Sequence, residues 1–409
     1  MARKAQLRVA VAGAGAFGRN HLRVLRELET EDAGAALVAA VDPDAARADE
    51  AAKQYGIPVF ASVDAMLKAD LKLDAACVAV PTVKHYEVAR ELLDAGLDLL
   101  IEKPLAASLA EADDLIQLQE KNGRIVQPGH LERFNPAVMA VEPSLTRPMF
   151  FEAHRLSVFT PRALDVDVVL DLMIHDLDIV LTFAKSPVRE VRAVGLPILS
   201  PKVDIANVRV EFESGCVANF TASRVSTERV RKLRFFEPRQ YVSIDYARRD
   251  VLVIRIDDKE AAGPNAQLAQ AAAQFLSTGK LDASVIQTLV ASGKIPAGLM
   301  MKVLAAKNDP EKLKEIAKGL AGPLAAPHDR PAPGLSPTPG LTFVKPEVTP
   351  GEPLKLELLS FLESVRTRRE PRVTARQGRA ALELALTIQA QMAAHAERAG
   401  LGDFFKSRS

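Results

Sequence analysis

Residues 7–18 read LRVAVAGAGAFG, a short β-branched and apolar run followed by glycines at the spacing G-x-G-x-x-G. The run predicts a buried strand, and a helical pattern begins directly after the third glycine, at Arg19. In such a junction the first glycine permits a tight turn, the second lets the backbone approach a pyrophosphate, and the third allows close helix packing. The free N–H groups of the helix N-terminus then face the phosphates. The predicted dinucleotide contacts here are Gly13, Gly15, Ala16, Phe17 and Gly18.

An acidic residue extends this pattern one strand later. The apolar run from Leu37 to Val41 ends in Asp42, 24 residues beyond Gly18. A carboxylate at this position can accept hydrogen bonds from both hydroxyls of the adenosine ribose and would repel a 2′-phosphate. The sequence therefore predicts NAD, in preference to NADP, as the cofactor. The alternative is a glycine turn without a ligand, followed by an ordinary surface aspartate.

Short strand-like runs alternate with helical patterns up to about residue 125. This alternation predicts an α/β domain with a doubly wound parallel sheet of the Rossmann type. The predicted strands are 7–12, 36–41, 57–60, 74–80, 97–101 and 124–127.

The pattern changes from about residue 149, where strand-like segments follow one another with short links and a single helix at about 165–184. This texture predicts an α+β domain with a mostly antiparallel sheet. The later string AGPLAAPHDRPAPGLSPTPG contains too many prolines for regular structure, and two helices of 3.6-residue periodicity close the chain. We expect an NAD-binding domain at 1–128, a substrate and oligomerisation domain at 129–260 and 346–405, and a partly disordered, Ala/Pro-rich insertion at 261–345.

The overall composition indicates a globular chain with a small-molecule partner. It has 409 residues, 48% apolar and 26% charged, with 53 Lys and Arg against 52 Asp and Glu, so no net field attracts nucleic acid or a membrane. Cys77 and Cys216 lie in apolar runs without a second cysteine nearby, which argues against disulfides or structural zinc. Neither a secretory signal nor a membrane-spanning run is evident, so we expect a cytoplasmic protein.

A polar stripe runs along the otherwise apolar helix predicted around residues 167–181. Steps of four and three residues place Asp167, Asp171, His175 and Asp178 on one face. Asp171 could orient the His175 imidazole, which is a candidate general acid or base. The alternatives are a solvated helix edge, or a divalent metal held by His175 and two of the acids. We expect no metal, because that ligand set is thin.

A lysine follows the predicted strand 97–101, in the string Glu102-Lys103-Pro104. Ligands of open α/β sheets bind beyond the carboxyl ends of the strands, so Lys103 should point into the crevice and suits proton transfer at a carbinol. We further predict that the Lys103–Pro104 bond is cis. The predicted border of the cofactor site comprises Pro81, His85, Glu102 and Lys103.

These motifs together resemble the glucose-fructose oxidoreductase / inositol dehydrogenase / MocA family, over nearly the whole chain except about 262–345. The similarity lies in VAGAGAFGRNHL, VDPDAARA, VAVPTVKHYEVA, LLDAGLDLLIEKPLA and DLMIHDLDIV. The further strings PGHLERFNPA, DVDVVLDLMIHDLDI, FTASRVS and GEPLKLELLSFL look like the branch similar to UDP-N-acetylglucosamine 3-dehydrogenases. The insertion departs from the family pattern and leaves substrate access and oligomer packing open.

The resemblance implies an NAD-dependent dehydrogenase that oxidises a secondary hydroxyl of a sugar or nucleotide sugar to a ketone. In that family the Lys of E-K-P and the Asp and His of D-x-x-x-H form the catalytic group, here Lys103, Asp171 and His175. Lys103 or His175 would take the hydroxyl proton while the carbon-bound hydrogen passes as hydride to C4 of NAD⁺. A UDP diphosphate would need guanidinium partners. The candidate substrate contacts are Arg133, Asn135, Arg155 and Arg224.

Other functions remain open from the sequence. The chain could be a regulatory module that binds NAD without turnover, although the intact Lys103, Asp171 and His175 argue against it. It could be a metal-assisted lyase or hydrolase, for which the glycine loop would be unnecessary. Within the dehydrogenases, a free sugar or inositol is the alternative substrate. We expect a homodimer or homotetramer formed through the antiparallel sheet, with no nucleic-acid or membrane partner.

Overall fold

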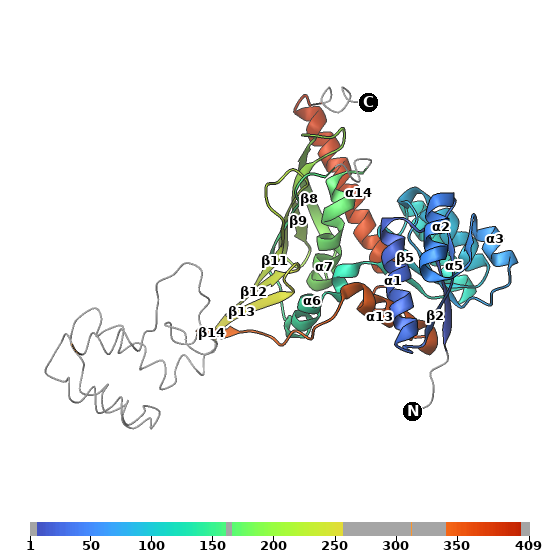
Figure 1. Ribbon diagram of the computed structural model, residues 1–409. Helices are drawn as coiled ribbons and strands as arrows, with labels where there is room; N and C mark the ends of the chain where they lie inside the picture. Colours follow the sequence, from blue (N-terminus) through green and yellow to red (C-terminus); the bar gives the residue numbers. More distant parts are fainter. Residues whose placement is uncertain (1–5, 161–165, 257–311, 313–340, 402–409) are drawn as a thin grey trace. The chain divides into compact units, whose positions relative to one another are not determined.

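The structure is a computed structural model that describes residues 6–160, 166–256, 312 and 341–401 (Figure 1). The chain divides into two compact units. The first comprises Met1–Phe235, Ile244–Asp250 and Val348–Ser409, and the second comprises Phe236–Ser243 and Val251–Glu347. The domain boundaries that we placed from the sequence remain a proposal.

A six-stranded parallel sheet begins the first unit, with the strand order β3-β2-β1-β4-β5-β6. Helices link successive strands, so the predicted doubly wound sheet is confirmed. The strand order reverses between β1 and β4, which is the switch point where such sheets bind ligands. The elements are β1 (Leu7–Ala12), α1 (Ala16–Thr30), β2 (Ala35–Val41), α2 (Ala45–Tyr55), β3 (Val59–Phe60), α3 (Val63–Lys68), β4 (Ala75–Val78), α4 (His85–Asp94), β5 (Asp98–Glu102), α5 (Leu109–Asn122) and β6 (Val126–Gly129).

Both faces of this sheet are buried, because successive strand residues pack on opposite sides. Val9 and Val11 contribute to one core and Ala10 to the other. The core that contains Val9 is completed by α1 and by a helix from the C-terminal region, α13 (Pro353–Thr367). The opposite core is completed by α4, α5 and the first turns of the last helix, α14 (Ala375–Arg398). The two predicted closing helices are therefore confirmed, and they cover the N-terminal sheet.

Two positions in the loop after β1 require glycine. Gly13 has a φ of +98°, and a Cβ there would lie 2.6 Å from the carbonyl oxygen of Ala79. A Cβ on Gly18 would lie 1.7 Å from the carbonyl oxygen of Gly13. Any side chain at either position would thus collide with backbone atoms, and the loop could not keep its close turn against α1.

A second sheet of the first unit has the strand order β11-β7-β10-β9-β8. Strands β8, β9 and β10 pair antiparallel, whereas β10 and β7 are parallel. One face is buried in alternation along the strands, and α14 packs along β8 and α7. The elements are α6 (Pro136–Val141), β7 (Phe150–Leu156), a π-helical turn (Val169–Met173), α7 (Ile174–Ala184), β8 (Val188–Leu196), β9 (Ile205–Phe212), β10 (Val217–Ser223) and β11 (Val230–Glu237).

The second unit contains a strand that the sequence analysis missed. Strand β13 (Asp250–Ile256) pairs antiparallel with β14 (Leu341–Val344), after β12 (Gln240–Asp245). Strand β14 lies inside the range 261–345 that we interpreted as a partly disordered, Ala/Pro-rich insertion, so residues 341–344 of that range form regular structure. The string LTFV has strand-forming residues and finds a pairing edge on β13. The rest of that range, apart from residues 312 and 345, lies outside the described residues.

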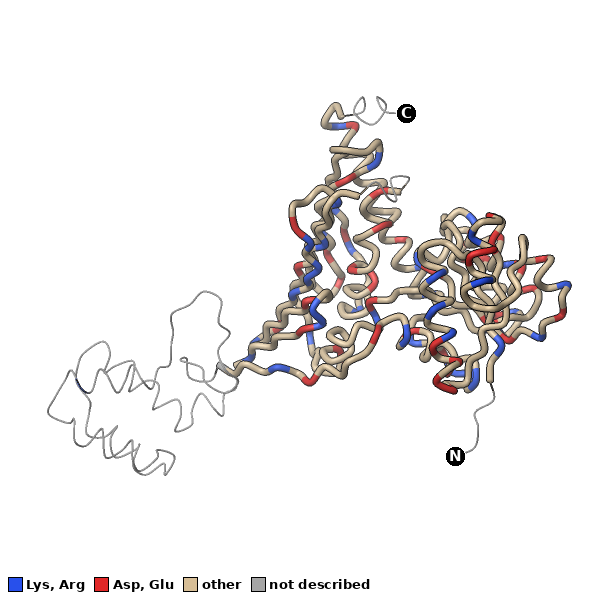
Figure 2. Tube along the Cα trace, in the orientation of Figure 1, with Lys and Arg blue, Asp and Glu red and all other residues tan. Residues whose placement is uncertain are grey.

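Positions of acidic and basic residues are interspersed along the described part of the chain (Figure 2), and their totals in the whole sequence are nearly equal. None of the helices in the described part of the chain is long and apolar enough to cross a membrane.

Candidate active site

The glycine loop presents an uncapped helix end. Helix α1 begins at Ala16, and no side chain accepts a hydrogen bond at its N-cap, Gly15. A Cβ on Gly15 would meet no atom within 4 Å, so the space beside it is open. Phe17 is 56% exposed next to this space. The structure thus brings together the five predicted dinucleotide contacts, and the free N–H groups of α1 fit a pyrophosphate.

Asp42 ends β2 beside this loop and is nearly buried. Its Oδ2 accepts a hydrogen bond from the backbone N–H of Ala14 at 2.8 Å, and its Oδ1 accepts from that of Asp44 at 2.9 Å. The Nε of Arg47 donates to the same Oδ1 at 3.2 Å. The sequence analysis missed Arg47, although the string DPDAAR contains it. A guanidinium therefore lies beside the carboxylate that we expect to select NAD.

Lys103 follows β5 at the carboxyl edge of the parallel sheet. The Lys103–Pro104 peptide bond is cis, as predicted. The Lys103 ammonium donates to the backbone carbonyl oxygens of Asp171 at 2.6 Å and Leu170 at 3.3 Å. Burial lowers the pKa of Lys103, and the nearby carboxylates of Asp171 and Glu102 partly oppose that effect. The neutral amine, which can accept a proton, is therefore more accessible here than at a surface lysine.

Lys103 contacts a π-helical turn, Val169–Met173, which directly precedes helix α7. The N–H of Ile174 donates to the carbonyl oxygen of Val169, five residues earlier. This wider turn changes the predicted alignment of the polar stripe, which assumed 3.6 residues per turn. Asp167 instead accepts hydrogen bonds at the start of the helix, from the N–H groups of Val169 at 2.9 Å and Leu170 at 3.1 Å. Asp167 thus serves as a cap at the start of this helix, a role that the predicted stripe of four polar residues did not include.

His175 lies on the first turn of α7. Burial lowers the pKa of His175 well below its usual value, and the charges of Lys103 and Arg155 lower it further. The imidazole is thus neutral near neutral pH and can accept a proton. Its Nδ1 is buried without a hydrogen-bond partner among the described residues. In the same part of the chain no hydrogen bond joins the Asp171 carboxylate to this ring, and Asp171 acts electrostatically on Lys103 instead.

A buried ion pair supports the backbone next to Lys103. The Nε2 of His21, on α1, lies 2.8 Å from Oε1 of Glu102. Burial opposes the charged forms, but hydrogen bonds to Cys77 and Glu102 raise the pKa of His21 well above its usual value. The hydrogen bond and charge of His21 likewise outweigh burial and lower the pKa of Glu102. Glu102 is thus held as a carboxylate behind the site.

The two residues expected to border the cofactor after β4 differ in exposure. Pro81 is exposed and precedes a short 3₁₀ turn, Thr82–Lys84. His85 is buried, with Nδ1 at 2.8 Å from the carbonyl oxygen of Pro104 and Nε2 at 3.0 Å from that of Val80. Its contacts indicate that His85 fixes the loop of Lys103. As a direct cofactor contact it remains a prediction.

The four candidate substrate contacts are all engaged inside the protein. Arg155 forms two hydrogen bonds with Asp176, at 2.7 and 3.1 Å, and one with Glu132 at 3.1 Å. The remaining three candidates also form hydrogen bonds with groups of the protein itself, which favours structural roles for all four. Arg133 donates to Thr182 and to the carbonyl of Arg372, Asn135 caps α6 and donates to the carbonyl of Tyr246, and Arg224 donates to the carbonyls of Val166 and Val203.

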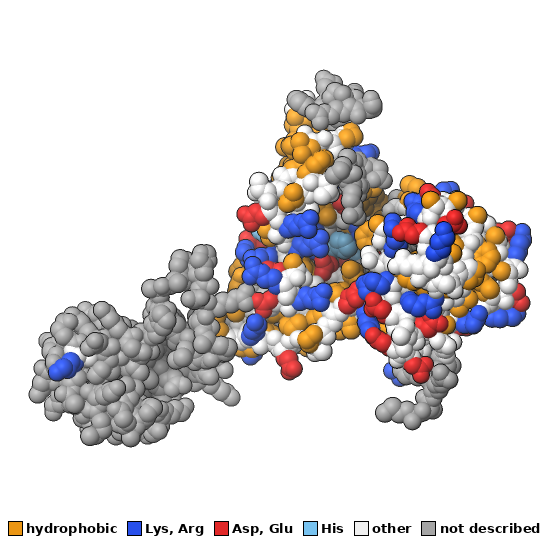
Figure 3. Space-filling view, viewed as in Figure 1, with side chains coloured by type: hydrophobic (Ala, Val, Ile, Leu, Met, Phe, Trp, Pro, Cys, Tyr) orange, Lys and Arg blue, Asp and Glu red, His pale blue; other side chains and the backbone are white. Residues whose placement is uncertain are grey.

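A different arginine, Arg231 on β11, is better placed to meet an anion. It is exposed, and its positive charge acts on both His175 and Arg155. The described part of the chain offers its guanidinium neither an ion pair nor a hydrogen bond. The alternating polarity of VRKLRFFE was the signal that could have identified it. The space-filling view shows a histidine at the bottom of a hollow, with basic side chains gathered nearby (Figure 3).

Metal ligands do not converge at this site. The described residues contain no group of three or more His, Cys, Asp or Glu side chains that could hold a metal ion. Asp178, one of the two acids of that alternative metal set, instead places its Oδ1 3.6 Å from Nη1 of Arg133.

Comparisons with known proteins agree with this arrangement. Residues 7–130 match the GFO/IDH/MocA oxidoreductase family with an NAD-binding Rossmann fold, and residues 138–238 match the GFO/IDH/MocA C-terminal domain. A UDP-N-acetylglucosamine 3-dehydrogenase from Acidithiobacillus ferrooxidans is 36% identical over 241 residues, which cover 59% of this chain and 74% of the relative. A Bacillus subtilis scyllo-inositol 2-dehydrogenase (NAD(+)) is 28% identical and covers 54% and 68%, respectively. A solved structure of the Acidithiobacillus enzyme superposes with a TM-score of 0.71, at 27% identity, covering 95% of this chain and 98% of that one.

Proposed function

The chain belongs to the GFO/IDH/MocA family of NAD-binding oxidoreductases, and on this premise we propose that it oxidises the C3 hydroxyl of UDP-N-acetylglucosamine to a ketone. That it is an NAD-dependent dehydrogenase of a sugar-type hydroxyl follows from the family and its relatives. The nucleotide sugar is the proposed part, because a relative that is 36% identical carries that name.

The observation that carries the proposal is the meeting of Lys103, Asp171 and His175 at the carboxyl edge of the parallel sheet. Lys103 lies next to Asp171 and follows a strand that ends at the switch-point edge. Burial lowers the pKa of both Lys103 and His175, so the site contains two side chains whose neutral, proton-accepting forms are more accessible than they would be at the surface. A regulatory module without turnover would not need such a pair.

The residues of this chain fit an NAD molecule. The uncapped start of α1 can hold the pyrophosphate, and Asp42 can accept hydrogen bonds from the adenosine ribose. When bound, NAD⁺ supplies the acceptor for the hydride. Lys103 then takes the proton of the substrate hydroxyl, and Asp171 stabilises the resulting ammonium. His175 can orient the same hydroxyl, because its neutral ring still accepts a hydrogen bond.

An anionic substrate also suits the basic residue on the neighbouring sheet. Arg231 is exposed and close enough to His175 to affect its charge state. A diphosphate accepts paired hydrogen bonds from a guanidinium, whereas an inositol has no such group. Arg231 is therefore our proposed contact to the diphosphate.

The direct test is an oxidation assay with purified protein and NAD⁺. UDP-N-acetylglucosamine, UDP-glucose, free N-acetylglucosamine and scyllo-inositol are supplied separately, and NADH absorbance is followed. We expect the highest kcat/KM with UDP-N-acetylglucosamine, and mass spectrometry after borodeuteride reduction should place deuterium at C3. Turnover of inositol without turnover of UDP sugars would contradict the proposal and favour the second candidate, which the similarity to inositol dehydrogenases supports.

Two further expectations belong to the same proposal. We propose a homodimer or homotetramer formed through the outer face of the antiparallel sheet, and residence in the cytoplasm. The exposed Val194 and Leu196, 42% and 40% accessible on β8, support an interface on that sheet.

A further inference from the structure

A buried histidine and a buried aspartate next to the candidate site have polar atoms without a hydrogen-bond partner among the described residues. His130 is 1% exposed and Asp178 is 2% exposed. Neither ring nitrogen of His130 has a hydrogen-bond partner in the described part of the chain. The same is true of Oδ2 of Asp178. The Nδ1 of His130 lies 3.9 Å from Oδ2 of Asp178. Buried polar atoms are nearly always hydrogen-bonded, so this pair requires an explanation.

The strand register places His130 beside the catalytic lysine. Glu102 pairs with Gly129 at the ends of β5 and β6, so Lys103 and His130 each follow directly after the paired end of one of these adjacent strands. Adjacent strands lie roughly 5 Å apart. The titratable and charged groups that face His130 are Asp178, Arg133, Lys103, Glu102 and His175.

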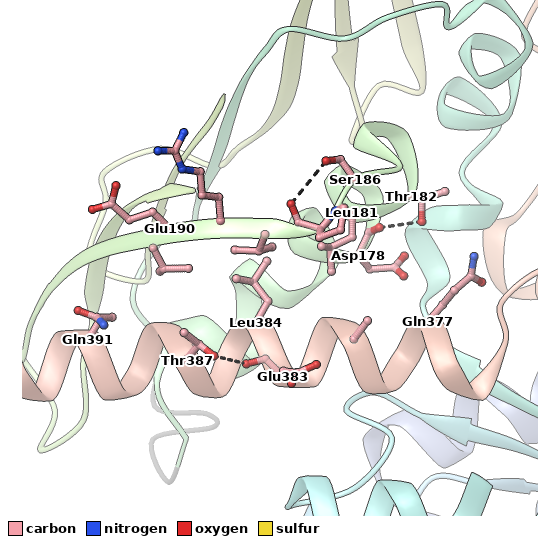
Figure 4. Close-up of a pocket in the computed structure, with 15 residues that line it drawn as sticks. Asp178, Leu181, Thr182, Ser186, Glu190, Gln377, Glu383, Leu384, Thr387 and Gln391 are labelled. Atoms are coloured by element: carbon pink, nitrogen blue, oxygen red, sulfur yellow. Dashed lines mark hydrogen bonds between the residues drawn. The ribbon is translucent and has the colours of Figure 1, made fainter. Parts of the chain in front are cut away.

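The other end of the pair reaches a groove that opens to solvent. This cavity of about 670 Å³ lies between α7, β8 and α14, and Asp178 lines it from α7 (Figure 4). Thr387 and Gln391 of α14 line the same groove and are exposed. Lys103 and His175 do not line it. Asp178 therefore belongs to the buried pair and also lines the groove.

The reaction creates a proton that must leave the site. Oxidation of a secondary alcohol by NAD⁺ gives a ketone, NADH and one proton, so the site needs a route by which this proton reaches water. We propose that His130 and Asp178 carry this proton from Lys103 to water in the groove, a route that rests on the proposed dehydrogenase function.

Each transfer in this route is balanced. The substrate O–H bond breaks as an N–H bond forms on Lys103, and that proton then moves to one nitrogen of the neutral His130 ring. The other ring nitrogen releases a proton to Oδ2 of Asp178, and the carboxylic acid releases it to water. Burial lowers the pKa of His130, so the ring is neutral before transfer and holds the proton only briefly. Arg133 faces Oδ1 of Asp178, which leaves Oδ2 for the histidine.

The test separates hydride transfer from proton release. His130→Gln, His130→Phe and Asp178→Asn are compared with wild type by stopped flow, with NADH absorbance and a pH indicator in weak buffer. We expect the first turnover of NADH to stay within about twofold of wild type, while proton release and kcat fall roughly tenfold or more at unchanged KM. Added imidazole should restore kcat in His130→Gln. Glu383→Gln removes an exposed acid of the same groove and should leave both signals unchanged.

The outcomes are distinguishable. If the His130 variants release protons as fast as they form NADH, at wild-type kcat, the route is wrong although the dehydrogenase function stands. A loss of kcat in His130→Gln that imidazole and other small buffers do not restore would also overturn it, because a structural role alone predicts that result. If the wild-type protein forms no NADH from any sugar, the proposed function fails and the route fails with it.

Discussion

Burial shifts the pKa of both candidate bases, Lys103 and His175, in the same direction. It lowers the pKa of Lys103 and of His175, because an apolar surrounding disfavours the positive form. A base with a lowered pKa is available at lower pH than usual. We therefore predict that kcat/KM rises with pH through an apparent pKa below that of an ordinary lysine, and a pH profile of the wild-type enzyme would check this. A rise of kcat/KM centred on the usual pKa of a lysine would contradict this prediction.

Removal of either base should affect chemistry and spare cofactor binding. We predict that Lys103→Ala and His175→Ala each lower turnover by roughly 10² or more, the range for loss of a general acid or base. NAD binding, measured by fluorescence titration, should stay near the wild-type value, because the glycine loop and Asp42 supply those contacts. A variant that kept most of its turnover would remove that residue from the catalytic group.

We expect the choice between NAD(H) and NADP(H) to depend on Asp42 and Arg47, which carry opposite charges. We predict that NAD(H) binds at least roughly tenfold more tightly than NADP(H), since the Asp42 carboxylate repels a 2′-phosphate. Asp42→Ala should narrow this gap by also freeing the Arg47 guanidinium, which donates to Asp42 in the wild type. Asp42→Ala/Arg47→Ala should then bind NADP(H) less tightly than Asp42→Ala. If the wild type bound NAD(H) and NADP(H) with equal affinity, Asp42 would not discriminate between the two cofactors.

At the scale of single elements, helix α13 introduces a carboxyl group into the core. Glu357 is fully buried, and neither of its carboxyl oxygens has a hydrogen-bond partner among the described residues. Burial, and then the charge of Glu102, raises the pKa of Glu357 well above its usual value. The group is therefore protonated in the folded protein over a pH range in which it is ionised in the unfolded chain.

The sign of the resulting pH dependence follows from linkage. Stability from the raised pKa of Glu357 is present below the usual glutamate value and is lost as pH rises towards the folded value. We predict that the melting temperature of Glu357→Gln falls less than that of the wild type from about pH 6 to about pH 9. The raised pKa of His21 also makes stability fall as pH rises, and this loss of stability occurs equally in the wild type and in Glu357→Gln. Glu363→Gln, on the exposed side of the same helix, should follow the wild type, and parallel curves for all three would refute the prediction.

The parallel sheet could be predicted because its signals are side chains in the chain itself. The glycines at 13, 15 and 18 and the apolar strand runs specify the local turn and the burial on both faces. The family motifs also singled out Lys103, Asp171 and His175 as catalytic candidates, and the structure places these residues close together. The acceptors of Lys103 could not be found, because they are backbone carbonyls presented by a π-helical turn, and a 3.6-residue periodicity does not reveal that turn.

The arginines show a second limit of sequence reasoning. Arg155 was predicted to meet substrate because its charge suits a diphosphate, yet Asp176 pairs with it inside the fold. Asp176 lies one residue after His175, on a helix face that the periodic pattern did not relate to β7. Only tertiary packing shows which guanidinium is already paired and which, like Arg231, is open.

For the whole molecule, we proposed above that assembly uses exposed apolar side chains of the second sheet. We predict that Val194→Asp/Leu196→Lys reduces the oligomer to smaller species, because charges on an interface must lose hydration without a partner. Light scattering after size exclusion would measure the mass. Lys53→Asp, an exposed change on α2, is the control and should keep the wild-type mass. A wild-type monomer, or an unchanged mass in the double variant, would contradict this prediction.

The packing of α13 and α14 on the N-terminal sheet has a consequence for biosynthesis. Residues 7–129 leave the ribosome first, but the apolar surfaces contributed by Phe361 and Leu382 are made last. At about 5–20 residues per second, the nascent sheet waits on the order of 10–50 s for them. During that time both of its faces lack part of their cover, so the emerging chain is a natural client for chaperones, and a ribosome stalled before residue 353 would display an aggregation-prone nucleotide-binding half.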